Sequence, residues 1–475
     1  MLSDIRIKEL IPHYTFEQAR TPLKFGAVVV DGVDFCRVEA IVENGRGQTA
    51  SGWGAIFLMD FWGWPTPELS HDVKAAAMKE VTERYIKLAT SYDEPGHPVD
   101  IFLALEDDLR RINVEVCRER VGRDILDRPG TTGGPGCPAP RVQQPFLGAL
   151  VCASPVDAAL HDAFGNVNGI DTYDGYGRDF MSDLSQYLGP KYAGKYAADY
   201  IRPQYLPEIP IFHLVGGLDK LTRGEVDDSD PQDGRPNCLE EWIEFEGVYC
   251  LKVKLRGTDL DWDVERTMAV YEIGRERLAK RGQTEMHLTA DTNEQCASPD
   301  YIIEYLERIR ARSQDCYDRI LYIEQPTERD LTANRHDMRK IAALKPVIVD
   351  ESLTDLDSFD LAMELGWSGV ALKSCKGQSS DILFASRAKE EGVAYSVQDL
   401  TNPGLSLLHS VGLGARLYTI MGVEANSRQF FPDATSEAEK RVHGDIFRLQ
   451  GGRARTGSLR GTGLGYQMEK IRSCE

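Results

Sequence analysis

Five short segments between Cys250 and Lys376 decide the fold, and each is an apolar run that ends in charged residues. In chain order they read CLKVKLRG (250–257), HLTADTNE (287–294), LYIEQPTE (321–328), PVIVDES (346–352) and GVALKSCKG (369–377). They carry two lysines, then three acids, then two lysines again, namely Lys252, Lys254, Asp291, Glu324, Asp350, Lys373 and Lys376. Short apolar runs bounded by turn residues are typical of buried β-strands. We therefore expect these charges at the ends of successive strands.

The five segments belong to a longer series in which strands alternate with helices. From about residue 209 to residue 426 we identify eight strand–helix units, of which the eighth helix is weak. Repeated βα units predict a parallel sheet, and eight of them predict a closed α/β barrel of the (β/α)8, TIM-like type. An open, doubly wound sheet is disfavoured because no G-x-G-x-x-G follows an early strand. Catalytic groups of such barrels lie at the carboxyl ends of the strands.

The first 205 residues have a different pattern. Residues 1–60 alternate apolar with polar side chains and predict a strand meander, whereas residues 70–117 show helical spacing. Residues 127–141, DRPGTTGGPGCPAPR, predict a surface insertion, and Ser154-Pro155 predicts the start of a buried helix. The stretch 52–65, GWGAIFLMDFWGWP, holds three of the six tryptophans. It fits either core packing or a glycine-hinged loop that closes over a pocket.

Composition excludes several classes of protein. The formal net charge of −20 argues against a nucleic-acid partner and against binding to an anionic membrane surface. No apolar run is long enough to span a bilayer, and the N-terminus does not resemble a signal peptide. The ten cysteines contain no C-x-x-C pair, which favours reduced thiols in a cytoplasmic protein.

The three acids predict a metal site. A single acid at a strand end is usually a helix cap or a salt-bridge partner. Three ionised carboxylates brought together by consecutive strands instead need a cation, because like charges raise one another's pKa. A hard divalent ion with oxygen ligands satisfies them, and Mg²⁺ is the ion that fits best.

The lysines predict a base beside that metal. Lys252 and Lys254 are two residues apart on one strand, so both point to the same face, and the apolar residues between them point the other way. We expect both inside the barrel mouth, opposite Lys373. An ammonium near another ammonium and a metal has a lowered pKa and can act as a general base. This arrangement predicts abstraction of a proton α to a substrate carboxylate, through an enediolate that the metal stabilises.

The motifs K-x-K, A-D-T-N, I-E-Q-P, V-D-E-S and A-L-K-x-x-K-G resemble the enolase superfamily. The resemblance is closest to its muconate lactonizing subgroup, in the mandelate racemase/muconate lactonizing enzyme family. It implies that Asp291, Glu324 and Asp350 bind Mg²⁺ and that Lys254 and Lys373 act on opposite faces of the substrate. Lys252 would hold the substrate carboxylate and depress the pKa of Lys254. Asn293, Glu351 and Lys376 match positions behind these groups.

The same resemblance suggests the domain organisation. It implies an N-terminal α+β capping domain over residues 1–205, a catalytic barrel over 206–425 and a C-terminal segment, 426–475, that packs back on the cap. Residues 18–26 and 52–65 match the cap loops that determine substrate choice in that family. The segment 219–237 is an addition that follows the first barrel strand, at the active face.

Departures from the family pattern leave the substrate open. No His-Asp pair stands around the sixth and seventh strands, which disfavours the mandelate racemase branch. Four further residues either line the pocket or are structural, namely His213, Gln398, Asp399 and Glu424. We expect racemisation or epimerisation, cycloisomerisation or dehydration of a small-molecule carboxylate by a homo-oligomer. The alternatives are a non-catalytic metal- or anion-binding barrel, an acid-sugar dehydratase of the same superfamily, or an unrelated hydrolase with paired carboxylates.

Overall fold

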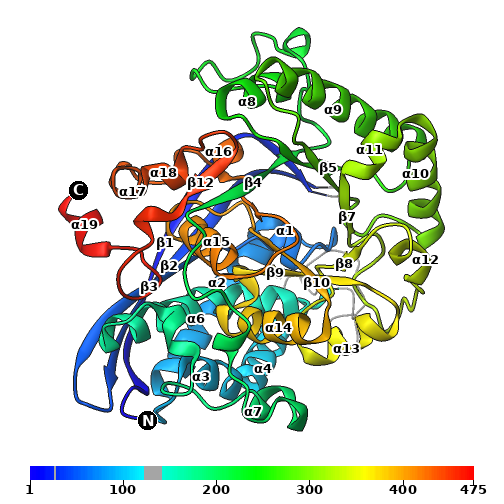
Figure 1. The fold of residues 1–475 in the computed structure, drawn as a ribbon. Helices are drawn as coiled ribbons and strands as arrows, with labels where there is room; N and C mark the ends of the chain where they lie inside the picture. Colours follow the sequence, from blue (N-terminus) through cyan, green and yellow to red (C-terminus); the bar gives the residue numbers. More distant parts are fainter. Residues whose placement is uncertain (26–27, 122–141, 475) are drawn as a thin grey trace, which may run out of the picture.

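A closed parallel barrel forms the centre of the molecule (Figure 1). The computed structural model describes residues 1–25, 28–121 and 142–474. The barrel strands are β4 (Glu208–Val215), β5 (Cys250–Lys254), β6 (His287–Asp291), β7 (Ile320–Glu324), β8 (Val347–Val349), β9 (Gly369–Lys373), β10 (Ala394–Gln398) and β11 (Val423–Glu424). Each pairs in parallel with the next, and β11 pairs with β4. The predicted eight-stranded barrel is confirmed.

Helices follow the strands and cover the outside of the barrel. They are α8 (Leu239–Glu246), α9 (Leu260–Lys280), α10 (Pro299–Arg312), α11 (Gln314–Arg319), α12 (Arg339–Ala342), α13 (Leu356–Glu364), α14 (Gln378–Glu391), α15 (Gly404–Arg416) and α16 (Ser427–Phe430). The last has only four residues, in agreement with the weak eighth helix expected from the sequence.

Strand register aligns the charged residues at one end of the barrel. Lys254 is paired with Asp291, and Asp291 with Glu324. On the other side Lys373 is paired with Gln398. Because residues paired in parallel strands point to the same side of a sheet, these side chains share the barrel mouth.

The N-terminal region is an antiparallel sheet packed on helices. The sheet has the order β1 (Ile5–Phe25), β2 (Val28–Asn44) and β3 (Thr49–Phe57). Its helices are α1 (Asp60–Gly63), α2 (His71–Ser91), α3 (Pro98–Ala104), α4 (Glu106–Val116) and α6 (Phe146–Asn168). Gly52 and Gly54 lie in β3, where an added Cβ would collide with the backbone of α6 at Ala163 and Pro155. These two glycines serve close packing rather than a hinge.

The prediction that a helix starts at Ser154-Pro155 was wrong. Helix α6 begins at Phe146 and runs through Pro155. Proline cannot donate to the carbonyl four residues earlier, which is that of Val151. The Ser154 hydroxyl donates to that carbonyl at 2.9 Å instead, so the helix continues. It ends at Gly169, whose φ of 69° is left-handed.

The C-terminal residues contact both the barrel and the N-terminal region. They form α17 (Glu437–Val442), α18 (Gly444–Phe447), β12 (Arg453–Arg455) and α19 (Met468–Ser473), coloured red in Figure 1. β12 pairs antiparallel with β4. Leu464 donates its backbone N–H to Asp162 of α6 at 2.7 Å, and Arg472 pairs with Glu39 of β2 at 3.1 Å. The domain boundaries at residues 205 and 425 stay predictions.

Three other expectations concern the chain as a whole. The proposed insertion at 127–141 lies outside the described residues. Of the helices in the described ranges, none combines the length and apolar character that crossing a membrane requires. The described cysteines are free thiols, and all but Cys474 are buried.

Candidate active site

One buried ammonium joins three carboxylates at the barrel mouth. Lys252 Nζ lies 2.8 Å from Glu324 Oε1, 2.7 Å from Glu424 Oε2 and 3.1 Å from Asp291 Oδ2. Only 2% of the Lys252 side chain is exposed, and the acids are buried too. We expected Lys252 to hold a substrate carboxylate. In the structure its ammonium already binds carboxylates of this chain, so a substrate carboxylate would compete with them.

Two further lysines hold Asp350. Lys373 Nζ lies 2.6 Å from Asp350 Oδ2. Lys376 Nζ donates to the Asp350 backbone carbonyl at 2.6 Å, to Asp350 Oδ1 at 3.1 Å and to the Ala371 carbonyl at 3.1 Å. Because two of its three acceptors are backbone carbonyls, Lys376 fastens the end of β9 to the turn after β8. Gln325 adds to this turn, since its Oε1 accepts the Asp350 N–H at 2.8 Å.

Lys254 is the most accessible of the three lysines at the mouth. Its side chain is 12% exposed, against 5% for Lys373. Its ammonium donates to Asp291 and, at 2.9 Å, to Asn293 Oδ1. The Asn293 backbone N–H donates to Asp291 Oδ1 at 2.7 Å from a residue with φ of 45°. Asn293 therefore links the predicted base to the predicted metal ligand.

Despite burial, the charges at the mouth lower the pKa values of Asp291 and Asp350, which face lysines, and the pKa values of three other groups rise. Burial opposes the charged form of Lys252 and Lys373, but the surrounding carboxylates outweigh it and raise the pKa of both lysines. The lowered ammonium pKa expected from the sequence belongs to a site that holds a metal ion, and it stays a prediction. In the structure the Lys252 and Lys373 ammoniums lie closer to carboxylates than to another ammonium. Burial, with the charges of Asp291 and Asp350, raises the pKa of Glu324 to about 8.

The three predicted ligands fit a hard divalent cation by their chemistry. Carboxylate oxygens are the donors that Mg²⁺ prefers, and three such side chains lie at the ends of consecutive strands of the barrel. Within the described ranges, however, no group of three or more His, Cys, Asp or Glu side chains stands in an arrangement that could hold an ion directly. In the structure the lysine ammoniums hold those oxygens instead.

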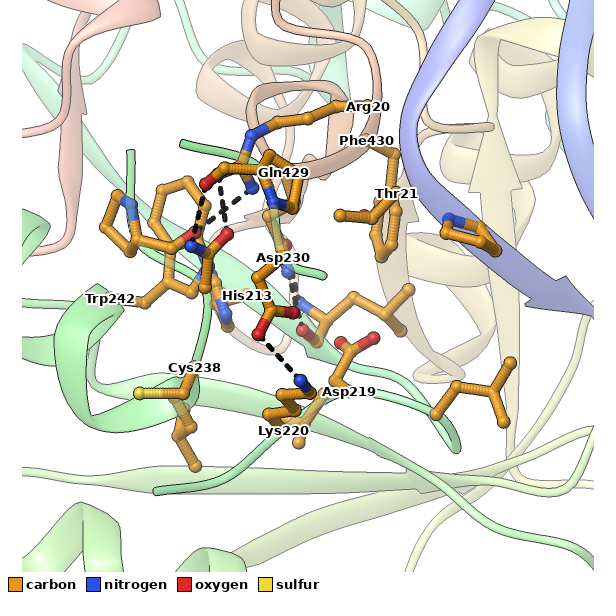
Figure 2. A pocket seen from close by; sticks show the side chains of 18 of the residues that line it. Arg20, Thr21, His213, Asp219, Lys220, Asp230, Cys238, Trp242, Gln429 and Phe430 are labelled. Carbon is orange, nitrogen blue, oxygen red and sulfur yellow. Dashed lines mark hydrogen bonds and ion pairs between the residues drawn. The ribbon is translucent and has the colours of Figure 1, made fainter. Parts of the chain in front are cut away.

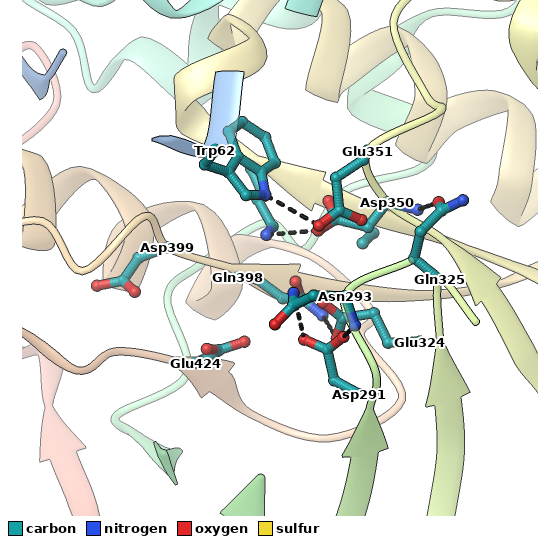
Figure 3. A network of polar contacts seen from close by, with 12 residues as sticks. Trp62, Asp291, Asn293, Glu324, Gln325, Asp350, Glu351, Gln398, Asp399 and Glu424 are labelled. Atoms are coloured by element: carbon teal, nitrogen blue, oxygen red, sulfur yellow. Dashed lines mark hydrogen bonds and ion pairs between the residues drawn. The ribbon is translucent and has the colours of Figure 1, made fainter. Parts of the chain in front are cut away.

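Trp62 of the tryptophan-rich stretch reaches the site from the N-terminal region (Figure 3). Its indole N–H donates to Glu351 Oε1 at 3.1 Å, and Lys373 Nζ lies 4.7 Å from the centre of its ring. Arg329 donates to the Trp62 carbonyl at 2.9 Å and pairs with Glu294. The stretch is thus both buried packing and the cover of the site. The clustered tryptophans indicated that this stretch could cover a pocket, but no pattern in the sequence pointed to Trp62 or Arg329 individually.

Most of the remaining predicted residues also gather here. Gln398 Nε2 donates to Glu324 Oε2 at 2.6 Å, and Asp399 is buried next to it with Oδ2 unpaired among the described residues. A small cavity of ≈ 40 Å³ lies at the barrel mouth, lined by Met59, Phe61, Trp62, Leu214, Lys252, Lys254, Asn293, Lys373, Asp399, Leu400, Thr401, Glu424 and Asn426.

His213 does not join this cluster. It lies on β4 next to Leu214, and the alternation of the strand turns its ring outward against Trp242, at 5.3 Å between ring centres. It lines a second cavity of ≈ 430 Å³, which the 219–237 segment helps to enclose (Figure 2). Burial lowers the pKa of His213 well below its ordinary value.

Arg20 closes the same cavity from the β1 side. Its guanidinium binds both oxygens of Asp233, at 2.7 and 2.8 Å, and Asn237 Oδ1 at 2.7 Å. It also donates to the carbonyls of Pro236 and Arg235. The loop expected to influence substrate choice is therefore fastened to the additional barrel segment.

Comparison with known proteins agrees with this architecture. Residues 237–471 match the family model described as "Enolase C-terminal domain-like". The L-Ala-D/L-Glu epimerase of Bacillus subtilis is similar in structure, with a TM-score of 0.60 and 15% identity over 97% of this chain and 98% of that one. For 2-chloromuconate cycloisomerase from Rhodococcus opacus the TM-score is 0.58 and the identity 16%, over 99% of each chain.

A third similar structure was solved with ligands. It is a dipeptide epimerase from Enterococcus faecalis complexed with Mg and the dipeptide L-Leu-L-Tyr, with a TM-score of 0.57 and 14% identity over 97% of this chain and 99% of that one. No curated protein matches the sequence.

Proposed function

Because this chain belongs to the enolase superfamily, whose C-terminal domain model matches residues 237–471, we propose that it is a Mg²⁺-dependent enzyme that removes the proton α to a substrate carboxylate. The observation that carries the proposal is that Lys254 and Lys373 line one small cavity from opposite strands of the barrel. Asp291 binds Lys254 and Asp350 binds Lys373, whereas Glu324, the third buried carboxylate, binds Lys252. A base on each face and a site for a cation are the groups that this reaction needs.

Asp291, Glu324 and Asp350 are the residues that would hold the ion. When bound, Mg²⁺ supplies positive charge that stabilises a substrate carboxylate whose α-carbon is losing a proton. Lys252 binds both Asp291 and Glu324 through its ammonium and adds a fixed positive charge beside them. Gln398 orients the second oxygen of Glu324.

Lys254 and Lys373 would move the protons. An amine that is to accept a proton must first leave its carboxylate partner as an ammonium and release one proton to solvent. Substrate and ion binding would bring about this exchange of partners, because the ion would take over the carboxylates. Lys254 Nζ then takes the α-proton on one face, and Lys373 Nζ takes or returns a proton on the other. Use of both amines gives racemisation or epimerisation, whereas use of one gives cycloisomerisation or dehydration, with the second amine acting only as a cation.

The cover of the site would have to open for a substrate to bind. The cavity between Lys254 and Lys373 measures only ≈ 40 Å³, and Met59, Phe61 and Trp62 line it from the N-terminal region. We propose that this region acts as the cap of a catalytic barrel over residues 206–425. The cytoplasmic location and the homo-oligomeric state stay predictions.

Exchange of solvent deuterium into the α-position tests the proposal. We expect the protein with MgCl₂ to label at least one member of a panel of dipeptides, N-acylamino acids, muconolactones and sugar acids. Excess EDTA should abolish the labelling and added Mg²⁺ should restore it. Replacement of either Lys254 or Lys373 by Met should slow exchange on its own face by about a hundredfold or more.

Two results would favour the other candidates. Calorimetric binding of a carboxylate without exchange by any panel member would indicate a non-catalytic binding barrel. Turnover that survives EDTA would indicate a hydrolase with paired carboxylates.

A further inference from the structure

Helix α14 begins directly after Lys376, and its N-terminus lacks a cap of its own. The N-cap residue is Gly377, which has no side chain to accept the free N–H groups of the first turn. Asp157 of helix α6 takes this role from the N-terminal region. Its Oδ2 accepts the Ser379 N–H at 2.9 Å, and its Oδ1 accepts the Ser379 hydroxyl at 2.7 Å. A carboxylate at this end also interacts favourably with the helix dipole.

Gly377 makes the close approach of the two regions feasible. Its φ of 101° is one that residues with a side chain rarely adopt. A Cβ at this position would lie 3.2 Å from Asp157 Oδ2 and 3.2 Å from the Phe102 ring. The glycine therefore leaves room for the carboxylate that caps the helix.

The capped turn is bonded directly to Lys373. Asp381, in the first turn of α14, accepts the Lys373 backbone N–H at 3.1 Å. Ser374, next to it, bonds Ser410 of α15 through its hydroxyl at 3.1 Å. The backbone of Lys373 is thus fastened to the helix end that Asp157 caps.

A buried chain of hydrogen bonds surrounds this cap. His161 Nε2 lies 2.9 Å from the Ser379 hydroxyl, and its Nδ1 lies 3.1 Å from the Tyr176 hydroxyl. Gln378 Nε2 donates to Tyr176 at 3.0 Å, and its Oε1 lies 2.8 Å from His409 Nε2. With His161 protonated on Nε2 alone, every group in this series of hydrogen bonds has a suitable donor or acceptor. The interface is therefore specified by directional bonds as well as by packing.

We propose that Asp157 is a positioning residue for Lys373. Its carboxylate fixes the Ser374–Asp381 segment and thereby aims the Lys373 side chain into the small cavity. The inference rests on the function proposed above, in which Lys373 serves one face of the substrate. It assigns to the N-terminal region a second task besides covering the site.

Asp162 offers a matched control on the same helix. Like Asp157 it is a buried aspartate of α6 that accepts backbone N–H groups from distant segments, those of Trp53 at 2.9 Å and Leu464 at 2.7 Å. Among the described residues it makes no hydrogen bond to residues 373–381, so loss of its carboxylate should disturb the C-terminal segment instead.

The first measurement is hydrogen–deuterium exchange on the full-length protein, which needs no substrate. Asp157→Asn should speed amide exchange in peptides covering 373–381 by about tenfold or more. Asp162→Asn should instead speed it in peptides covering Trp53 and residues 462–466, and leave 373–381 unchanged. Ser379→Ala, which removes only the hydroxyl bonds, should give a smaller increase at 373–381 and provides a milder variant if Asp157→Asn folds poorly. Unchanged exchange at 373–381 in both Asp157→Asn and Ser379→Ala would overturn the proposal.

The second measurement separates positioning from general stability. Asp157→Asn should slow α-deuteration of the enantiomer whose proton faces Lys373 by on the order of tenfold to a hundredfold. The enantiomer that faces Lys254 should keep its rate within about twofold. Equal slowing on both faces would show a merely structural role and overturn the proposal. If the wild-type protein labels no carboxylate at all, the proposed function fails, and the amide exchange still decides whether Asp157 orders the Lys373 segment.

Discussion

Trp62 donates its indole N–H to Glu351 Oε1 at 3.1 Å, across the junction between the N-terminal region and the barrel. The other oxygen of this buried carboxyl, Oε2, has no partner among the residues that the structure describes. Phenylalanine at position 62 would keep most of the ring and remove the only partner that the structure shows for the Glu351 carboxyl.

We therefore expect Trp62→Phe to lower kcat/KM for the substrate by about tenfold, because an unpaired buried acceptor costs about 1 to 3 kcal/mol. Trp64→Phe is the control, since Trp64 is equally buried, its indole N–H is unpaired among the described residues, and it does not line the small cavity. Equal losses in the two variants would contradict a specific role for the Trp62–Glu351 bond.

Lys252→Met should destabilise the protein in the presence of EDTA. The change leaves Asp291, Glu324 and Glu424 without the ammonium that joins them, and breaking a buried ion pair costs about 3 to 5 kcal/mol. Thermal unfolding followed by circular dichroism should show a lower midpoint than the wild type. Lys220→Met, which removes an ammonium from the exposed Asp227 and Asp230 pairs, should leave the midpoint nearly unchanged. A wild-type midpoint in Lys252→Met would show that these carboxylates need no internal counter-ion.

Arg20→Ala should release the 219–237 segment. The side chain binds Asp233 through two bonds and Asn237 through a third, and charge-assisted bonds of this kind are the stronger ones. Limited proteolysis should cleave within 219–237 at least about tenfold faster than in the wild type. Arg308→Ala, which removes an exposed ion pair from helix α10, provides the control. Equal cleavage rates in all three proteins would show that Arg20 does not hold the segment.

The free energy of unfolding should fall as the pH is lowered, because His97 is buried in its neutral form. Burial lowers the pKa of this imidazole from 6.5 to about 3, and its Nδ1 accepts the Val99 N–H at the start of α3. Between these two values the unfolded chain binds a proton that the folded protein excludes, so the stabilising contribution is complete above pH 6.5 and is lost towards pH 3. The free energy at stake is about 5 kcal/mol.

His97→Asn keeps a side chain that can cap α3 and removes the titration. The variant should be less stable than the wild type at neutral pH, because the smaller side chain leaves a cavity. The difference between their unfolding midpoints should narrow as the pH is lowered from 6.5. A constant difference over this range would contradict the assignment to His97.

Local patterns predicted the barrel and most of the site. Alternation on the 250–254 strand was enough to place Lys252 and Lys254 on one face, and the structure brings them to Asp291 and Glu324. From the sequence, Glu424 and Gln398 could either line the pocket or be structural. In the structure Glu424 binds Lys252, and Gln398 binds Glu324. The role of His213 was open in the same way, and the structure places its ring against Trp242, on the opposite face of β4 from the lysines.

Other features depend on partners that are far away in the chain. The start of α6 could not be found from Ser154-Pro155, since the same dipeptide caps a helix or continues one according to which carbonyl the serine reaches. The direction of the lysine pKa shifts depends on which charge lies nearest, and the order of residues along the chain does not state it.

The amino-acid sequence alone determined the strand order, the end of the barrel that carries the charges and the identity of those charges, because periodicity and turn residues act within a few positions. Only the tertiary structure decided that the Trp62 ring packs on the Lys373 ammonium, that Arg20 binds Asp233 and that Asp157 caps the helix after Lys376. Those contacts join residues more than two hundred positions apart, and chain folding, rather than any local pattern, brings them together.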